Sequence, residues 1–132
     1  MDQNNENKIE LNVSDPLRIA EYVVSILDSK KAGDIKLLHV ADKTIITDYM
    51  VLCSGNSGTQ IRSLGDEIEY KLDEAGVKLA HSEGVPAGGW VLLDYGCVIV
   101  HIFSKEARKN YNLEKLYQDG DEIDVSHLIT QD

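Results

Sequence analysis

A short polar turn at residues 54–57 carries the first side chains that could do chemistry. It joins an apolar run to a helical pattern, and backbone N–H groups at the start of a helix can bind a phosphate. A nucleotide-binding P-loop would continue with Gly-Lys-Ser or Gly-Lys-Thr, whereas here Gly58 is followed by Thr59 and the turn holds no cation. We therefore favour a structural role, in which the glycine forms the turn and Asn56 or Ser57 caps the helix.

Carboxylates and histidines offer little further chemistry. The turn is similar to the Gly-Ser opening of nucleotidyltransferases, but their metal-binding Asp pair is missing, because Asp94 stands alone on its strand. One carboxylate cannot supply the several oxygen ligands that magnesium requires. His101 lies in an apolar run that favours a structural role, and the histidines share no ligand spacing. We expect no enzyme, no metal and no cofactor; a nucleotidyltransferase-like nucleotide-binding enzyme is the alternative.

The apolar strand over residues 90–95 is a stronger candidate, as a partner-binding site. Trp90, Leu92 and Asp94 alternate onto one face of this strand, and the intervening residues lie on the other. Trp90 is the only tryptophan in the sequence, and tryptophan is enriched among interface hot spots. A sealed core would rarely accept the charge of Asp94 beside it. The residue types leave two roles open for Trp90, an interface anchor or a plug in the core.

The elements that position these residues follow from the hydrophobic periodicity and its breakers. A capping oxygen before Pro16 starts the first helix, and Gly33 is expected to stop it. Gly96 lies in the turn of a hairpin. The expected elements are strands over residues 35–41, 49–53, 90–95 and 97–103, a further short strand over 77–81, a loop over 83–89, a second helix ended by Gly76, and short helices over 104–109 and 113–117.

This order of elements predicts one α/β (α+β) domain over residues 14–117. Its core is a mixed sheet of about four to five strands flanked by helices. Residues 1–13 are polar and are expected to be disordered. Residues 118–132 form an acidic tail that is expected to be mobile.

The chain is acidic, with 23 Asp and Glu against 13 Lys and Arg and a net charge of −10. Direct nucleic-acid binding is not expected, because it depends on cationic side chains. A basic protein is a better partner, although acidity can also serve solubility alone. No apolar run reaches the roughly 20 residues of a membrane helix, so no membrane contact is expected. Cys53 and Cys97 are expected to be thiols in a reducing cytosol, which predicts a cytoplasmic protein.

Several motifs stand in the same order and at the same spacing as in one known family. The match spans about residues 15–117. The motifs are Thr47-Asp48-Tyr49, residues 54–57 with Gln60, Glu83-Gly84, residues 90–96, residues 100–103, and Arg108 with residues 111–116. On these residues the chain resembles the ribosomal silencing factor family of bacteria and organelles, also called Iojap or YbeB-like.

The resemblance implies a nucleotidyltransferase-like fold that has lost its catalytic carboxylates. It implies a translation repressor that binds the large ribosomal subunit through its protein fourteen, blocks joining of the two subunits, and acts when nutrients are scarce. The family's Trp-led motif implies partner-binding residues at Trp90, Leu92, Leu93, Asp94 and Tyr95. The apolar hairpin would also suit a homodimer when no ribosome is present.

Two positions depart from the family's pattern. Cys97 stands where an acidic residue is usual, and Tyr117 stands where tryptophan is usual. If that acidic residue pairs with the ribosomal partner, docking is altered in this chain.

Overall fold

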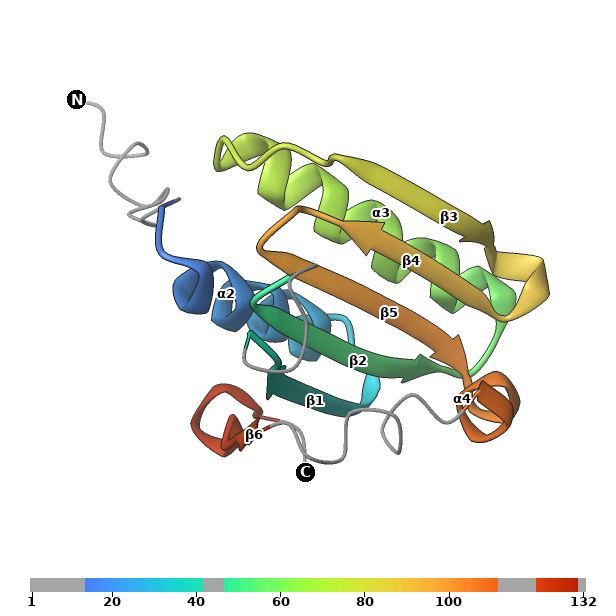
Figure 1. Ribbon diagram of the computed structural model, residues 1–132. Coiled ribbons are helices and arrows are strands. Elements are labelled where there is room, and N and C mark those ends of the chain that lie inside the picture. Colours follow the sequence, from blue (N-terminus) through green and yellow to red (C-terminus); the bar gives the residue numbers. More distant parts are fainter. Residues whose placement is uncertain (1–13, 42–46, 112–120, 131–132) are drawn as a thin grey trace.

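A six-stranded mixed sheet forms the centre of the computed structural model, which describes residues 14–41, 47–111 and 121–130 (Figure 1). The strand order is β3-β4-β5-β2-β1-β6. In chain order the elements are α2 (Pro16–Ser29), β1 (Gly33–His39), β2 (Tyr49–Gly55), α3 (Gly58–Glu74), β3 (His81–Val85), the 3₁₀ turn η1 (Pro86–Gly88), β4 (Trp90–Asp94), β5 (Val98–Ser104), α4 (Lys105–Tyr111), β6 (Asp121–Ile123) and the 3₁₀ turn η2 (Ser126–Leu128). The expected α/β class is confirmed, with more strands than predicted.

The centre of the sheet is a parallel pair, β2 beside β5, and the other neighbouring strands pair antiparallel. Residues 50–55 of β2 are all buried, as are residues 98–103 of β5. A parallel pair needs a long crossover, which α3, β3 and β4 supply between them. The continuous apolar runs in the sequence therefore mark strands that are covered on both faces.

Two packed layers of side chains lie on opposite faces of the sheet. Both long helices, α2 and α3, pack against one face and form the larger core with side chains such as Val51 and Ile102. On the other face a smaller cluster joins Leu52 and Phe103 to Ala107 of the short helix α4. Among the described helices, none is long and apolar enough to cross a membrane. Within the described residues, β4 has one face covered by the long helices and one face that carries the smaller cluster.

The first helix begins as its sequence predicts but ends earlier. The Asp15 carboxylate caps it by accepting a hydrogen bond from the Leu17 N–H (3.1 Å), and Pro16 occupies the first turn. The helix ends at Ser29, and Lys31 adopts a left-handed conformation with φ 63°. The sequence predicted that Gly33 would end this helix. In the structure Gly33 is instead the first residue of β1.

The edge strand β3 differs from the sequence prediction. A strand was expected at residues 77–81 and a loop at 83–89, whereas the strand runs His81–Val85 and pairs with β4. All five residues of β3 are exposed, so no apolar alternation marks it. The strand forms because β4 offers an unpaired edge, and Gly84 allows the close approach. Its φ is 88°, and a Cβ there would overlap the Trp90 carbonyl oxygen.

The expectation of a mobile acidic tail is wrong for residues 121–130. β6 adds to the outer edge of β1, and Val125 is buried against the larger core. The Thr130 hydroxyl donates to Asp28 Oδ2 (2.8 Å), and its N–H donates to the same carboxylate (3.2 Å), which ties this segment to α2. The expected helix at 113–117 and the predicted disorder of residues 1–13 lie outside the described residues.

We predict that Gly84→Ala lowers the free energy of unfolding by about 2 kcal/mol or more, because it adds a steric overlap to a left-handed backbone. Gly76→Ala is the matched control, since Gly76 has φ 87° but nothing within 4 Å of the added Cβ. That variant should lose only about 1 kcal/mol. Urea denaturation of both proteins measures the difference, and equal losses would contradict the overlap at β3.

Candidate partner-binding site

The Trp-led strand β4 lies second from the edge of the sheet, between β3 and β5. Trp90, Leu92 and Asp94 are half-buried on the face that carries the smaller cluster and α4, which we call the outer face of β4. The partner-binding residues expected on this face are therefore within reach of another protein. Val91 and the other alternate residues point toward α2 and α3.

Leu93 and Tyr95, the other two predicted partner-binding residues, lie on that helix-covered side. Leu93 is 1% exposed and Tyr95 is 7% exposed, and both belong to the larger core. Because side chains alternate along a strand, they cannot share the outer face with Trp90. We therefore remove these two residues from the outer-face site. The period-two pattern already separated the two sets in the sequence.

Trp90 is held in place by two aromatic residues of β5. Its indole Nε1–H donates a hydrogen bond to His101 Nδ1 (3.1 Å). The indole, the imidazole and the Phe103 ring are stacked, with centroids 5.7–5.9 Å apart and interplanar angles of 7–18°. Phe103 and His101 are buried and Trp90 is half-buried. The two roles left open for Trp90 are thus combined, because the side chain packs against the smaller cluster and is still partly accessible.

His101 supports this arrangement only as a neutral imidazole. Its Nδ1 must carry a lone pair to accept from the indole, so any proton sits on Nε2. Burial among apolar residues lowers the pKa of His101 from its ordinary value of 6.5 to about 4. The residue was expected to be structural, and the added function is to orient Trp90. The sequence gives no direct signal for that contact, because it depends on the register of the hairpin.

Asp94 has a local partner in the turn between β4 and β5. Its Oδ1 accepts a hydrogen bond from the Gly96 N–H (2.7 Å), and Gly96 has φ 86°. The predicted hairpin is confirmed, with Tyr95 N–H bonded to the Val98 carbonyl at 2.9 Å. Asp94 is still half exposed at the end of the outer face, so its carboxylate presents negative charge there.

Arg108 anchors the helix that borders the outer face. This buried guanidinium donates from Nη1 to the Asp34 carbonyl (2.6 Å) and to Ser54 Oγ (3.0 Å). The contacts tie α4 to β1 and β2. The Ser104 hydroxyl accepts from the Ala107 N–H (3.0 Å) at the start of α4. Arg108 belongs to the motifs noted in the sequence, but its structural partners lie more than 50 positions away and could not be read from it.

The turn at residues 54–57 caps a helix, as we expected. The Ser57 hydroxyl accepts from the Gln60 N–H (3.1 Å), and the Gln60 side chain accepts in return from the Asn56 N–H (2.6 Å). This reciprocal pair satisfies donors that a phosphate would otherwise bind. At Gly55 a Cβ would come within 2.9 Å of Ile61, which explains the glycine.

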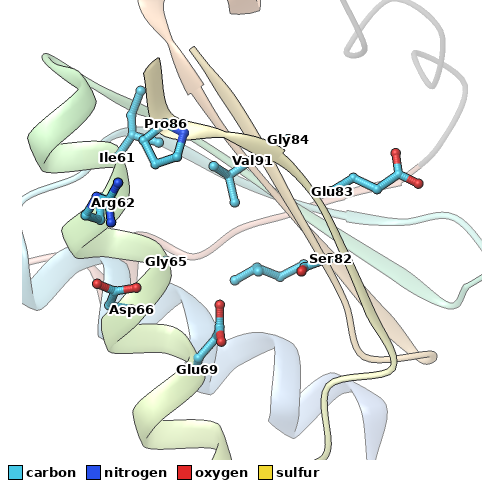
Figure 2. Close-up of a pocket in the computed structure, with 11 residues that line it drawn as sticks. Ile61, Arg62, Gly65, Asp66, Glu69, Ser82, Glu83, Gly84, Pro86 and Val91 are labelled. Atoms are coloured by element: carbon cyan, nitrogen blue, oxygen red, sulfur yellow. The ribbon is translucent and has the colours of Figure 1, made fainter. Parts of the chain in front are cut away.

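A cleft of about 170 Å³ lies between α3 and the β3–β4 pair. Figure 2 shows Asp66 and Glu69 projecting from α3 on one wall, with Ser82 in the opposite strand and Glu83 turned away from the helix. Arg62 is the single cation among its described lining residues. The carboxylates disfavour the phosphates of a nucleotide. In the part of the chain that the structure describes, no group of three or more His, Cys, Asp or Glu residues is placed to hold a metal ion.

Both cysteines are free thiols, as predicted. Cys53 is buried, and desolvation raises its pKa to about 12 despite the opposing charge of Arg108, so this thiol is unreactive at neutral pH. Cys97 is half-buried in the hairpin turn, and its backbone carbonyl accepts from the Asp48 and Tyr49 N–H groups (3.1 and 3.0 Å). Tyr117, the second departure from the family's pattern, lies outside the described residues.

The geometry defines a mixed α/β domain whose candidate site is a half-buried tryptophan on a strand face. The family model described as ribosomal silencing factor during starvation matches residues 13–132. Proteins named ribosomal silencing factor RsfS are similar to this chain: that of Bacillus subtilis is 36% identical over 113 residues, 86% of this chain and 96% of the relative. That of Zymomonas mobilis is 38% identical over 110 residues, 83% of each chain.

A solved structure from Chromobacterium violaceum has a TM-score of 0.76 at 33% identity, covering 79% of this chain and 87% of its own. More distant relatives include the chloroplastic protein Iojap of Arabidopsis thaliana, 30% identical over 85% of this chain and 47% of the relative. The chain belongs to the family of ribosomal silencing factors. The resemblance seen in the motifs is confirmed, and the bacterial relatives are named silencing factors.

We predict that acidification destabilises the protein between about pH 6.5 and pH 4 through His101. Its folded pKa of about 4 lies below the ordinary 6.5, so the unfolded chain takes up the proton first as pH falls. The stabilisation is therefore present above pH 6.5 and is lost progressively down to pH 4, by up to about 3 kcal/mol. His101→Asn retains an acceptor without titrating, so urea denaturation should show a smaller loss over this range. An imidazole pKa near 6.5 in an NMR titration of the native protein would contradict this.

Proposed function

We propose that this chain silences translation by docking on the large ribosomal subunit through the outer face of β4. Family membership supports a ribosome-associated silencing role, and the docking face and its partner are our inference. The partner we propose is the large-subunit protein fourteen, and the bound domain blocks joining of the small subunit. One observation carries the proposal: Trp90 is half-buried on an accessible strand face and is fixed there by His101 and Phe103.

A pre-positioned tryptophan is well suited to be an interface anchor. Binding costs conformational entropy for each side chain that becomes ordered, and the stack on β5 has already restricted the indole. Leu92 lies beside it on the same face and adds apolar area, while Asp94 adds a carboxylate at the end of the strand. This combination of an apolar centre and a charged rim is typical of protein interfaces.

The charge of the chain supports a basic protein partner. The net charge of −10 repels phosphate backbones at long range, so docking on exposed ribosomal RNA is disfavoured. The same charge speeds encounter with a cationic protein surface and discriminates against acidic ones. A factor that recognises a basic ribosomal protein needs no cationic patch of its own. Silencing by occupation of space also requires no catalytic group.

We predict that Trp90→Ala weakens binding to purified large subunits about 30-fold, the effect of losing roughly 2 kcal/mol at an interface hot spot. Cosedimentation across a concentration series measures the dissociation constant. Because Trp90 also packs on Phe103, Leu92→Ala is the second variant, which removes outer-face area outside the aromatic stack. Both should bind more weakly.

Charge at the same face is tested by Asp94→Asn, which retains the oxygen that accepts from Gly96 and removes the negative charge. Its matched control is Asp121→Asn, an exposed carboxylate in β6 at the far edge of the sheet. The first should reduce the salt dependence of binding more than the second. If folded Trp90 and Leu92 variants bind like the wild type, the outer face is not the docking site.

We also predict that the protein lowers the yield of joined ribosomes when it is added to purified small and large subunits. Light scattering follows association directly, and pre-incubation with the large subunit should inhibit more than pre-incubation with the small subunit. The Leu92→Ala protein provides the comparison, with weaker inhibition in proportion to its weaker binding. Unchanged association at saturating protein would contradict silencing by steric occlusion while leaving the docking result standing.

A further inference from the structure

The hydroxyl of Tyr95 is a buried polar group on the strand-facing side of the larger core. Tyr95 is 7% exposed, and its ring packs in the larger core. Its hydroxyl oxygen is buried and has no hydrogen-bond partner in the described part of the chain. Native proteins pair nearly all buried polar atoms, because an unpaired one loses its hydration without compensation. Among the described residues, this hydroxyl is therefore a candidate contact for a group that the fold itself does not supply.

This residue lines a cleft of about 290 Å³ between the C-terminal half of α3, the segment after it, and the turn that follows β4. Figure 1 shows that end of α3 near the β4–β5 turn. The cleft is lined by Glu69, Tyr70, Asp73, Val77, Leu79 and Tyr95. It lies on the helix-covered side of β4, so it is separate from the outer face that carries Trp90.

The lining favours a cation. Glu69 and Asp73 are one turn apart on α3, where like charges repel each other, and a bound cation would relieve this repulsion. Burial, together with the charges of these two carboxylates, raises the pKa of Tyr95, so its hydroxyl stays protonated and its oxygen can accept a hydrogen bond. The nearby cation Lys71 already pairs with Glu67 at 3.7 Å.

The remaining lining residues suit a flat cation on an apolar stem. Tyr70 is 60% exposed, and its hydroxyl bonds to Glu74 (3.2 Å), so its ring is oriented and accessible. A guanidinium group stacks on such a ring and donates several hydrogen bonds from one plane. Leu79, which is also exposed, offers apolar contact to the methylenes of the side chain.

We propose that this cleft binds an arginine side chain of a basic protein, with the guanidinium between Glu69 and Asp73 and against the Tyr95 hydroxyl. It is a second protein contact, on the other side of β4 from the proposed ribosomal docking face, and it does not depend on that docking. Phosphate-bearing ligands are disfavoured by the same two carboxylates.

The test titrates the isotope-labelled full chain with the peptide acetyl-Gly-Arg-Gly-amide and follows backbone amide shifts by NMR. Saturable shifts are expected around Tyr70, Asp73, Leu79 and Tyr95. The matched peptide with citrulline in place of arginine has the same shape without the charge and should bind much more weakly. Tyr95→Phe removes only the hydroxyl, so it should weaken binding about threefold or more without lowering the melting temperature.

Asp73→Asn is the second binding variant, and Glu122→Gln, an exposed carboxylate in β6, is its control for net charge. The first should weaken binding and the second should leave it unchanged. Equal binding of the citrulline peptide, wild-type affinity in Tyr95→Phe, equal effects of Asp73→Asn and Glu122→Gln, or absence of saturable shifts would each overturn the proposal. None of these outcomes bears on Trp90.

Discussion

The hydrogen bond from the Trp90 indole to the neutral His101 imidazole connects the candidate site to the core. It positions the largest side chain of the chain at the boundary between protein and solvent, and it requires the imidazole to stay buried and uncharged. The stack with Phe103 continues the contact into the smaller cluster beneath α4. Any rearrangement of β5 would therefore move the indole. The candidate site is therefore part of the packing of the smaller cluster rather than an addition to it.

Alternate residues of β4 face two different environments, the larger core and the outer face. Leu93 closes the core against α2 and α3, while Leu92 stays at the surface beside Trp90. The strand can do this because it has neighbours on both edges, with β5 inside and β3 outside. The exposed strand β3 thus has a structural role despite its lack of buried residues: it supplies hydrogen bonds to the outer edge of β4.

Local signals in the sequence predicted much of the fold. Asp15 and Pro16 marked the start of α2, Gly96 marked the hairpin, and unbroken apolar runs marked β2 and β5. Elements that form only by pairing were missed. Neither β3 nor β6 carries an apolar pattern, and each is a strand because a neighbour has a free edge. At such edges, strand formation depends on the tertiary context more than on the intrinsic strand propensity of the residues.

The candidate site was predictable in part. Trp90, Leu92 and Asp94 share one face of β4, and the alternation of side chains along a strand is enough to predict this. The same rule would have excluded Leu93 and Tyr95 from that face. The family motif placed all five residues in one predicted partner-binding site, because a motif is contiguous in sequence whereas a surface is not. The partners of Trp90 and Arg108 depend on strand register and on contacts between distant segments. No local sequence pattern predicts the strand register or these long-range contacts.

The pairing of β6 with β1 has a consequence for how the chain folds as it is made. β1 is synthesised early, and the strand that covers its outer edge is far downstream, after every other strand of the sheet. A nascent domain therefore exposes an open edge next to its hydrophobic helix α2 until residues 121–130 emerge and Thr130 reaches Asp28. Open edges can pair with other chains, so this interval favours aggregation of the polypeptide.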